Sequence, residues 1–286
     1  MLKLRFCLIE LFLTFIYQTI IHLQQLIKND TIEKSHRRMT MKTQAIEVTN
    51  LAKSFELSKG KTIQILNGLS LSANYGEFIS ILGVSGSGKS TLLKCMSGLL
   101  QPSQGKVEIQ GLDPYQTSPN KLAKLRRESL AFIFQSYNLV PALPIIENIA
   151  LPLRLSGKKV NNQEILDLLE KLQFKADSKA FPSTLSGGEQ QKIAIARAIL
   201  ADSQIIFADE PTGALDSTSR QIVFDILRTL ANQGKCILMV THDIELASKT
   251  DRALILKDGL ISQEIIKPKS EELTKALGIE TDVRER

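Results

Sequence analysis

The chain has 286 residues, of which 43% are hydrophobic and 23% are charged, so it has an ordinary globular composition and enough length to bury a large core. Its net charge of +6 does not indicate a nucleic-acid-binding protein, because residues 1–42 hold seven basic and three acidic residues and the remainder carries only +2. Three scattered cysteines exclude both a disulfide framework and a zinc site.

The first forty residues are apolar and basic. The run FCLIELFLTFIYQTIIHL at 6–23 approaches the length of a membrane-spanning helix, and five basic residues follow it through Lys42, which favours a cytoplasmic C-terminal side. No small-x-small cleavage site follows, which disfavours a signal peptide. Translation starting at Met39 or Met41 explains the run equally well. We expect residues 1–42 to be a dispensable leader, either a membrane or interfacial helix or a non-native start, and 43–286 to be the working domain.

From Ile46 the chain alternates between strand-like and helix-like segments. LSLSANYGE at 69–77 alternates apolar and polar residues and then turns at Asn74–Gly76, which predicts an antiparallel strand leaving a hairpin. Three short runs are almost wholly apolar and lie near helix-like segments, as buried parallel strands do: FISIL at 78–82, IIFA at 205–208 and CILMV at 236–240. Asp-Gly within LKDGLI at 256–261 predicts another hairpin.

Between Asn138 and Thr184 the strand pattern gives way to Leu-rich helical periodicity, most clearly in EILDLLEKL at 164–172. This segment predicts a helical subdomain, at about 138–184, inserted into a mixed sheet. The predicted fold class is therefore α/β, with a parallel-sheet core, an antiparallel β subdomain and an inserted α-helical subdomain.

GVSGSGKS at 83–90 follows the first apolar strand directly and opens a helix. It fits the nucleotide phosphate-loop pattern G-x-x-x-x-G-K-[ST]. Backbone N–H groups and the positive helix end would bind the phosphates, Lys89 would reach the β- and γ-phosphates, and the Ser90 hydroxyl would bind Mg²⁺. We expect the nucleotide to be bound by Gly83, Val84, Ser85, Gly86, Ser87, Gly88, Lys89, Ser90 and Thr91.

Two further strand ends carry acid–base side chains. Asp209 and Glu210 end the strand IIFA, where Asp209 suits a Walker B partner of Mg²⁺ and Glu210 suits a general base for the attacking water. His242 ends the strand CILMV and is expected at the same sheet edge, where α/β proteins bind their ligands. Because the chain has no Asn-Lys-x-Asp guanine motif, ATP is favoured over GTP. Hydrolysis of the nucleotide is favoured over phosphoryl transfer to a small acceptor.

LSGGEQQ at 185–191 and ADEPTGALD at 208–216, together with the phosphate loop, resemble the ATP-binding subunit of an ABC transporter over about residues 44–262. The resemblance implies a further role at each of three matching positions. Phe55 occupies the place of the aromatic residue that stacks on adenine, which is more often Tyr. Gln135 is the Q-loop glutamine that touches Mg²⁺ and senses the membrane subunit. Asp216 is the D-loop aspartate that communicates across a dimer.

The resemblance also implies a head-to-tail homodimer. Ser186, Gly187 and Gly188 would then bind the γ-phosphate of an ATP held by the other subunit, while His242 contacts the γ-phosphate within its own subunit. A local alternative is an ordinary helix N-cap in which Ser186 pairs with Glu189. That alternative gives no reason for two adjacent glycines, although both arrangements can hold together.

At a finer level the motifs are similar to the subfamily that serves lipoprotein release, macrolide export and antimicrobial-peptide resistance. This implies a peripheral protein at the cytoplasmic face of the inner membrane, with an integral membrane permease supplied as a separate chain and no nucleic-acid partner. The close alternative is a cell-division-type ABC ATPase that regulates a membrane partner without transporting. A non-transport ABC ATPase of translation or DNA repair is disfavoured, because the chain has one cassette and a helical insert of only about forty-five residues.

Overall fold

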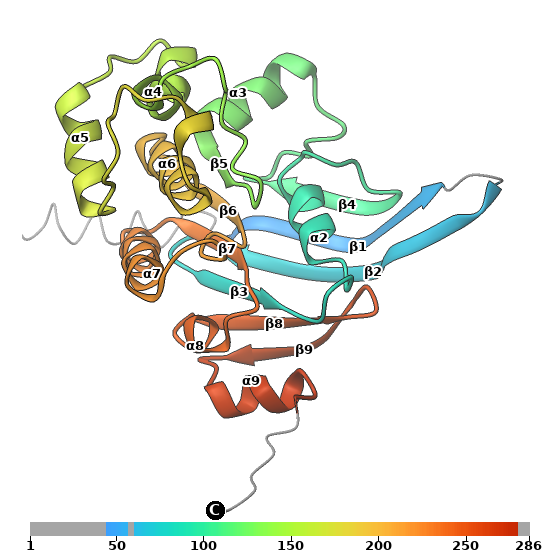
Figure 1. Ribbon diagram of the computed structural model, residues 1–286. Coiled ribbons are helices and arrows are strands. Elements are labelled where there is room, and N and C mark those ends of the chain that lie inside the picture. Colours follow the sequence, from blue (N-terminus) through green and yellow to red (C-terminus); the bar gives the residue numbers. More distant parts are fainter. Residues whose placement is uncertain (1–43, 57–59, 280–286) are drawn as a thin grey trace, which may run out of the picture. The chain divides into compact units, whose positions relative to one another are not determined.

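The computed structural model describes residues 44–56 and 60–279, which form two sheets with helices packed around them (Figure 1). The leader predicted at 1–42 lies outside the described residues. No helix in the described part of the chain combines the length and the apolarity that a membrane crossing needs.

A three-stranded antiparallel sheet is built in the order β2-β1-β4. A six-stranded sheet has the order β5-β6-β7-β3-β8-β9, in which only β9 runs antiparallel to its neighbour. The strands are β1 (Gln44–Glu56), β2 (Thr62–Asn74), β3 (Phe78–Leu82), β4 (Gln104–Ile109), β5 (Leu130–Ile133), β6 (Ile205–Asp209), β7 (Cys236–Val240), β8 (Arg252–Lys257) and β9 (Leu260–Ile266).

The three apolar runs predicted as parallel strands are β3, β6 and β7, which lie side by side within the six-stranded sheet. All of their residues are buried, because both faces of the sheet are covered. The hairpin predicted around Asp258 and Gly259 is also confirmed and joins β8 to β9.

The antiparallel strand predicted to leave a hairpin at 69–77 is confirmed: it forms the end of β2, which is antiparallel to the preceding strand β1. A turn does form after Asn74, whose carbonyl accepts the N–H of Glu77 at 3.3 Å. The chain then enters β3, which pairs with β7 and β8 in the other sheet because its wholly apolar sequence is buried there.

The helices are α2 (Lys89–Met96), α3 (Pro119–Ser129), α4 (Ile145–Leu155), α5 (Asn162–Lys171), η2 (Pro182–Thr184), α6 (Gly187–Leu200), α7 (Ser217–Asn232), α8 (Ile244–Ala247) and α9 (Ser270–Ala276). The segment 138–184, all of it described, contains no strand, and the helix predicted at 164–172 is α5. Helices α4, α5 and α6 share one hydrophobic core.

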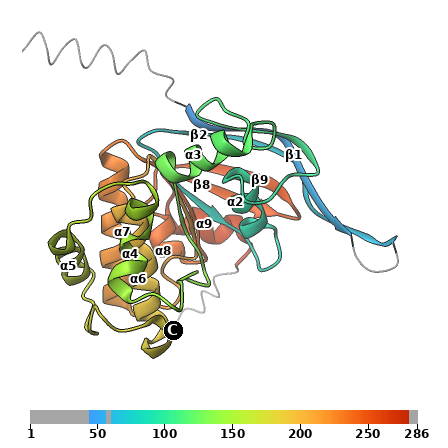
Figure 2. The ribbon, with the colours of Figure 1, turned by 90° about the horizontal axis from the view of Figure 1, so that it is seen from above.

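Alternating strand residues divide the interior into two main cores. Ile79 and Ile81 of β3 face α2 and the antiparallel sheet, whereas Phe78 faces the core that includes α4 to α7. Figure 2 shows this division, with α4 to α7 gathered on one side and α2, β1 and β2 on the other. The carboxyl ends of β3, β6 and β7, and the residues that follow them, are therefore brought to one edge between these layers.

Candidate nucleotide-binding site

The phosphate-loop sequence forms the predicted strand–loop–helix unit between β3 and α2. Gly88 is the N-cap of α2 and has a left-handed backbone with φ of 100°. Lys89 follows it and donates its ammonium to the carbonyls of Gly83 and Val84 at 2.8 and 2.9 Å. Burial lowers the pKa of Lys89, while the carboxylates of Glu210 and Asp209 oppose that shift. The loop thus presents a cation and a helix N-terminus to the same space, which suits a phosphate chain.

A hydrogen bond joins Ser90 to Asp209, the two residues predicted to act on Mg²⁺. The Ser90 hydroxyl donates to Oδ1 of Asp209 at 2.9 Å, across 119 residues of sequence. Asp209 ends β6 and is only 4% exposed. Burial raises the pKa of its carboxyl, partly offset by the hydrogen bond from Ser90 and by Lys94 and Lys89.

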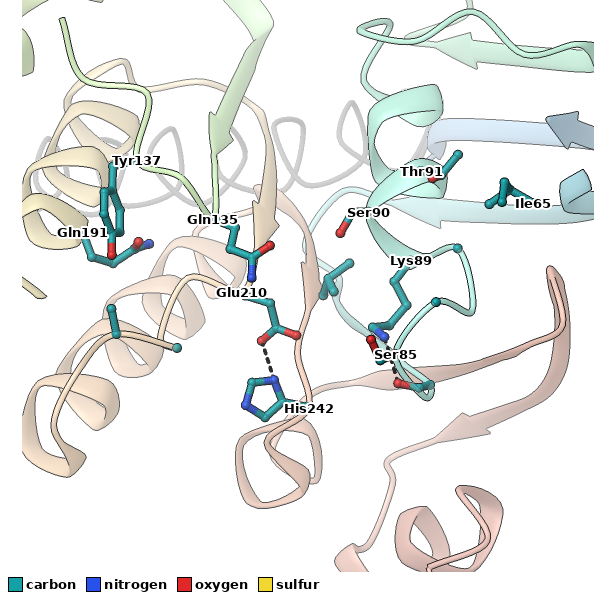
Figure 3. Close-up of a pocket in the computed structure, with 16 residues that line it drawn as sticks. Ile65, Ser85, Lys89, Ser90, Thr91, Gln135, Tyr137, Gln191, Glu210 and His242 are labelled. Atoms are coloured by element: carbon teal, nitrogen blue, oxygen red, sulfur yellow. Dashed lines mark hydrogen bonds and ion pairs between the residues drawn. The ribbon is translucent and has the colours of Figure 1, made fainter. Parts of the chain in front are cut away.

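Glu210 is held in a left-handed backbone conformation, with φ of 51°, just after β6 ends. Its N–H donates to the carbonyl of Val240 at the end of β7. Its Oε2 lies 3.0 Å from Nδ1 of His242, the contact drawn as a dashed line in Figure 3. The Glu210 side chain is 13% exposed and that of His242 is 75% exposed. A strained residue that keeps a buried carboxylate against an accessible imidazole is typical of a catalytic site.

Lys89, Ser90, Glu210 and His242 line a cavity of about 790 Å³, which is within the range of small-molecule sites, whereas Asp209 is buried behind Ser90 and does not line it. Among the predicted site residues, those that line it are Gly83, Ser85, Gly86, Gly88, Lys89, Ser90, Thr91, Gln135, Glu210 and His242. In Figure 3 Gln135 lies next to Glu210, and both lie across from Lys89 and Ser90 of the phosphate loop. The wall is thus built from segments 83–91, 135–137, 210–214 and 240–242.

Six lining residues were not predicted: Ile65, Tyr137, Gln191, Gly213, Ala214 and Val240. Gly213 and Ala214 belong to the quoted ADEPTGALD motif, and Gln191 belongs to LSGGEQQ, so the motifs contained a signal for them. Tyr137 stands two residues after Gln135, but a lone aromatic side chain in a loop has no pattern that would reveal it.

Phe55 does not line the cavity. It pairs with Ile63 of β2, but the register shifts between Lys53 and Ser54 of β1, so Ile65 has no partner in this ladder and the alternation of faces is interrupted there. Ile65 does line the cavity. Phe55 is 38% exposed and has the Lys53 ammonium 5.0 Å from its ring centroid. The ring is therefore partly accessible to a flat partner, and the adenine-stacking role of Phe55 stays a prediction.

The first residues of LSGGEQQ, unlike Gln191, lie away from the cavity that the phosphate loop lines in this chain. Ser186 is exposed and forms the capping box with Glu189: the Ser186 Oγ accepts the Glu189 N–H at 3.3 Å, and the Glu189 carboxylate accepts the Ser186 N–H at 3.2 Å. Neither Ser186, Gly187 nor Gly188 lines the cavity of its own chain.

The structure supplies a local reason for the two adjacent glycines that the sequence did not reveal. A Cβ at Gly187 would lie 2.9 Å from the hydroxyl of Tyr137, and a Cβ at Gly188 would lie 3.0 Å from the carbonyl oxygen of Ala214. Both contacts are closer than side chains normally tolerate. The start of α6 thus packs tightly against the loop that follows Gln135 and against the segment that follows Glu210.

Asp216 does not line the cavity and acts as the N-cap of α7. Its carboxylate accepts the N–H and the hydroxyl of Ser219 at 2.9 and 2.7 Å, and these bonds lower the pKa of the carboxyl. On the next turn Arg220 donates to Asp243 at 3.0 Å, which ties the start of α7 to the residue after His242.

The side chains at the loop fit Mg²⁺ better than a transition metal. Ser90 and Asp209 supply hard oxygen donors, and Gln135 adds an amide on the same cavity wall. Within 44–56 and 60–279 there is no cluster of three His, Cys, Asp or Glu residues that could enclose a metal. A site with one carboxylate and one hydroxyl suits Mg²⁺, which usually takes its remaining ligands from phosphates and water.

Comparison with known proteins gives one consistent family. Residues 66–213 match the sequence model described as ABC transporter. Over 218 residues the chain is 41% identical to the macrolide export ATP-binding/permease protein MacB of Mannheimia succiniciproducens, covering 76% of this chain and 34% of that relative. Over 216 residues it is 38% identical to the ABC transporter ATP-binding protein YvrO of Bacillus subtilis, covering 75% and 94% respectively. The chain thus spans about a third of the length of the MacB relative and nearly all of YvrO.

Among solved structures, the ATP-binding cassette MJ0796 matches with a TM-score of 0.74 and 35% identity, over 78% of this chain and 99% of that one. That structure is a dimer in a post-hydrolysis state bound to ADP and Pi. The 66–213 match includes the phosphate loop, Gln135 and the pair Asp209–Glu210.

Proposed function

Since this chain belongs to the family of ABC transporter ATP-binding proteins, we propose that it binds and hydrolyses ATP as the nucleotide-binding subunit of a transporter. The observation that carries the proposal is the convergence of three groups on one cavity. The Ser90–Asp209 hydrogen bond, the Lys89 ammonium and the Glu210–His242 contact all lie at the carboxyl edge of β3, β6 and β7.

Each side chain has a distinct task in hydrolysis. The loop amides and Lys89 bind the phosphates, and Phe55 stacks on the adenine. Ser90, Asp209 and Gln135 hold Mg²⁺, which supplies charge neutralisation on the phosphates when bound. Glu210 accepts the proton of the attacking water, and His242 orients the Glu210 carboxylate from 3.0 Å while its exposed ring contacts the γ-phosphate.

The complete site belongs to a head-to-tail dimer in this proposal. Ser186 is exposed at the start of α6, where the helix N-terminus is positive and the glycines leave backbone N–H groups accessible. These groups bind the γ-phosphate of an ATP held by the partner subunit. Dimeric MJ0796 with ADP and Pi is a relative of 35% identity that supports such an assembly. The local packing of Gly187 and Gly188 is compatible with this role, because it fixes the helix start.

The membrane partner is proposed to be an integral permease that is a separate chain and contacts a groove between α3, β5, α4 and α6. This groove has a volume of about 520 Å³, and its apolar lining includes Leu130, Phe132, Leu151, Pro152 and Leu155, of which Leu155 is 68% exposed. Strand β5 runs from the groove directly to Gln135. Contact here would place the protein at the cytoplasmic face of the inner membrane.

By relation to MacB, which is named for macrolide export, the proposed cargo class is a lipoprotein, antimicrobial peptide or macrolide-like molecule that is exported or extracted. The cell-division-type alternative, regulation of a membrane protein without transport, shares the same ATPase chemistry. The two alternatives differ in what the membrane partner does.

Affinity purification of the chain from membranes of its own organism, with identification of any polytopic membrane protein that binds it, followed by ATPase assays of the pair in detergent and in vesicles, tests the proposal. We expect the pair to bind, and the membrane protein to change Mg²⁺-dependent ATP hydrolysis that is absent in Lys89→Ala. Cargo movement in vesicles supports transport, and ATP-dependent regulation without movement supports the alternative. Absence of ATP hydrolysis in the pair would contradict both.

A further inference from the structure

Arg197 on the third turn of α6 holds the backbone of the loop that follows Gln135. Its two terminal guanidinium nitrogens donate to the carbonyl oxygens of Asn138 and Tyr137, at 2.7 and 2.9 Å. The two acceptors are sixty residues away in sequence and belong to consecutive residues. A planar guanidinium can bridge two neighbouring oxygens in this way, whereas an ammonium group is a single point of contact.

The loop that Arg197 holds is strained. Tyr137 and Asn138 both have left-handed backbones, with φ of 64° and 47°, although neither is glycine. Such conformations persist only where the surrounding structure imposes them. The backbone hydrogen bonds within this loop join residues close in sequence: the N–H of Tyr137 donates to the carbonyl oxygen of Phe134, and the N–H of Asn138 donates to that of Ser136. The guanidinium of Arg197 adds a contact from another element.

The same loop reaches the nucleotide cavity and the start of α6. Gln135 and Tyr137 both line the cavity, and in Figure 3 Tyr137 lies beside Gln191 of α6. The Tyr137 hydroxyl also occupies the space that a Cβ at Gly187 would need. Helix α6 therefore contacts this loop at two points, through Gly187 at its first residue and through Arg197 ten residues later.

Arg197 has no carboxylate partner among residues 44–56 and 60–279. It is half-buried, and burial lowers the pKa of its guanidinium. Removing part of a charged group from water costs free energy, and no ion pair with the described residues offsets that cost here. The two hydrogen bonds to backbone carbonyls are therefore the contacts that compensate for the burial of Arg197. Arg197 also lines the groove between α3, β5, α4 and α6, so it stands between that groove and the ATP cavity.

We propose that Arg197 is a positioning residue that holds the loop 135–138 against helix α6, so that Gln135, Tyr137 and the start of α6 keep one common arrangement at the ATP site. It touches no nucleotide itself. The inference rests on the proposed ATP hydrolysis, because its consequence for turnover is exerted through Gln135 and Gly187.

Two variants of Arg197 separate charge from geometry. Arg197→Lys keeps the cation but cannot bridge two carbonyls, and Arg197→Met keeps most of the apolar stem without the charge. The matched control is Arg126→Lys. The Arg126 guanidinium also donates to the carbonyl oxygen of a residue with positive φ, which is Gly98. Gly98 follows the C-terminal end of α2 and does not line the ATP cavity.

The first measurement is amide hydrogen exchange of the nucleotide-free protein. Exchange in the segment 134–140 should accelerate in both Arg197 variants by about 10-fold or more, while that of α5 stays unchanged, and Arg126→Lys should leave 134–140 at the wild-type rate. This readout does not depend on hydrolysis. A 134–140 segment that exchanges at the wild-type rate in Arg197→Lys and Arg197→Met would overturn the proposal, whether or not the protein hydrolyses ATP.

The second measurement is steady-state ATPase beside nucleotide affinity. Because a misplacement of about 1 Å can lower a rate by about 10²-fold, kcat should fall by about 10-fold or more in Arg197→Met and by less in Arg197→Lys, while the Kd for ATP stays within about twofold. A kcat of Arg197→Met and of Arg197→Lys equal to that of the wild type would overturn the proposal. A failure of the proposed function would be detected separately, because Glu210→Gln would then hydrolyse ATP as fast as the wild type.

Discussion

The imidazole Nδ1 of His242 lies 3.0 Å from Oε2 of Glu210, and the two side chains follow the ends of the neighbouring parallel strands β7 and β6. Glu210 is nearly buried and His242 is largely exposed. The imidazole therefore sits on the open side of the carboxylate, where it can hold the carboxylate in place and still face a bound phosphate.

Replacing His242 by Ala should lower kcat by about 10²–10³-fold, the usual effect of removing one well-placed hydrogen-bond donor from a reacting centre. The affinity for ATP should change little, because Lys89 and the loop amides are untouched. Steady-state ATPase and equilibrium nucleotide binding check this. Because His242 acts partly through the Glu210 carboxylate and partly on the γ-phosphate, the double variant His242→Ala/Glu210→Gln should be slower than Glu210→Gln by less than the factor that His242→Ala alone produces. A multiplicative loss in the double variant would show that they act separately.

Asp209→Asn should remove Mg²⁺-dependent hydrolysis without destabilising the nucleotide-free fold. Burial raises the pKa of Asp209, so its charged form opposes folding at pH values above that raised pKa, and this cost is absent below the ordinary carboxyl pKa of 3.8. Asn keeps an oxygen that accepts the Ser90 hydroxyl but carries no charge. The melting temperature at pH 7 should therefore be unchanged or higher, while ATPase activity across a Mg²⁺ titration is lost. A clearly lower melting temperature would mean that the carboxylate stabilises the fold.

The sequence was most informative where burial and chemistry were both local. Strands β3, β6 and β7 could be predicted because strands buried on both faces are wholly apolar and show no polar alternation. The phosphate loop could be predicted because each residue type in its pattern has its own role in binding phosphate or Mg²⁺. The sequence did not predict that β3 leaves the sheet of β2, because the turn after Asn74 has the same sequence pattern whether the next strand pairs with β2 or enters another sheet. Pairing was decided by the burial of the following five residues.

The site was readable motif by motif, but its internal connections were not. Nothing in the sequence relates Arg197 to the carbonyls of Tyr137 and Asn138, because a backbone acceptor leaves no trace in residue identity. Likewise, the tight packing of Gly187 against Tyr137 became visible only in three dimensions. Side chains that act by contacting backbone, rather than ligand, are the ones that sequence reasoning missed.

Gly188→Asp should impair the dimer and not the single subunit. The new carboxylate would stand at the start of α6, where it would repel the γ-phosphate of the partner subunit's ATP. Its Cβ would approach the carbonyl oxygen of Ala214 at 3.0 Å, so a small loss of melting temperature is expected as well. ATP binding by the monomer, measured by equilibrium dialysis, should stay within about twofold, and turnover should fall to background.

Asn161→Asp is the matched control for this variant, because it adds a carboxylate at the N-cap of another helix, α5, and retains the side-chain oxygen that accepts the Gln163 N–H. It should leave binding and turnover unchanged. Weaker ATP binding by the Gly188→Asp monomer would show that this glycine serves its own chain's nucleotide.

Glu210→Gln tests the central claim most directly. Glutamine keeps the size of the side chain but cannot accept a proton from water, and general-base catalysis contributes about 10²–10⁴-fold, so kcat should fall at least 10²-fold. Lys89, Ser90 and the loop amides still bind the phosphates, so affinity should be retained and both subunits should remain closed on two ATP molecules.

The decisive measurement is therefore steady-state ATPase beside size-exclusion chromatography with ATP, for wild type, Glu210→Gln and Lys89→Ala. The account predicts a slow Glu210→Gln protein that elutes as an ATP-dependent dimer, little dimer for wild type, and neither ATP binding nor dimer for Lys89→Ala. Near-normal turnover of Glu210→Gln would assign the base to another residue, with His242 the nearest candidate at 3.0 Å, and would contradict the mechanism.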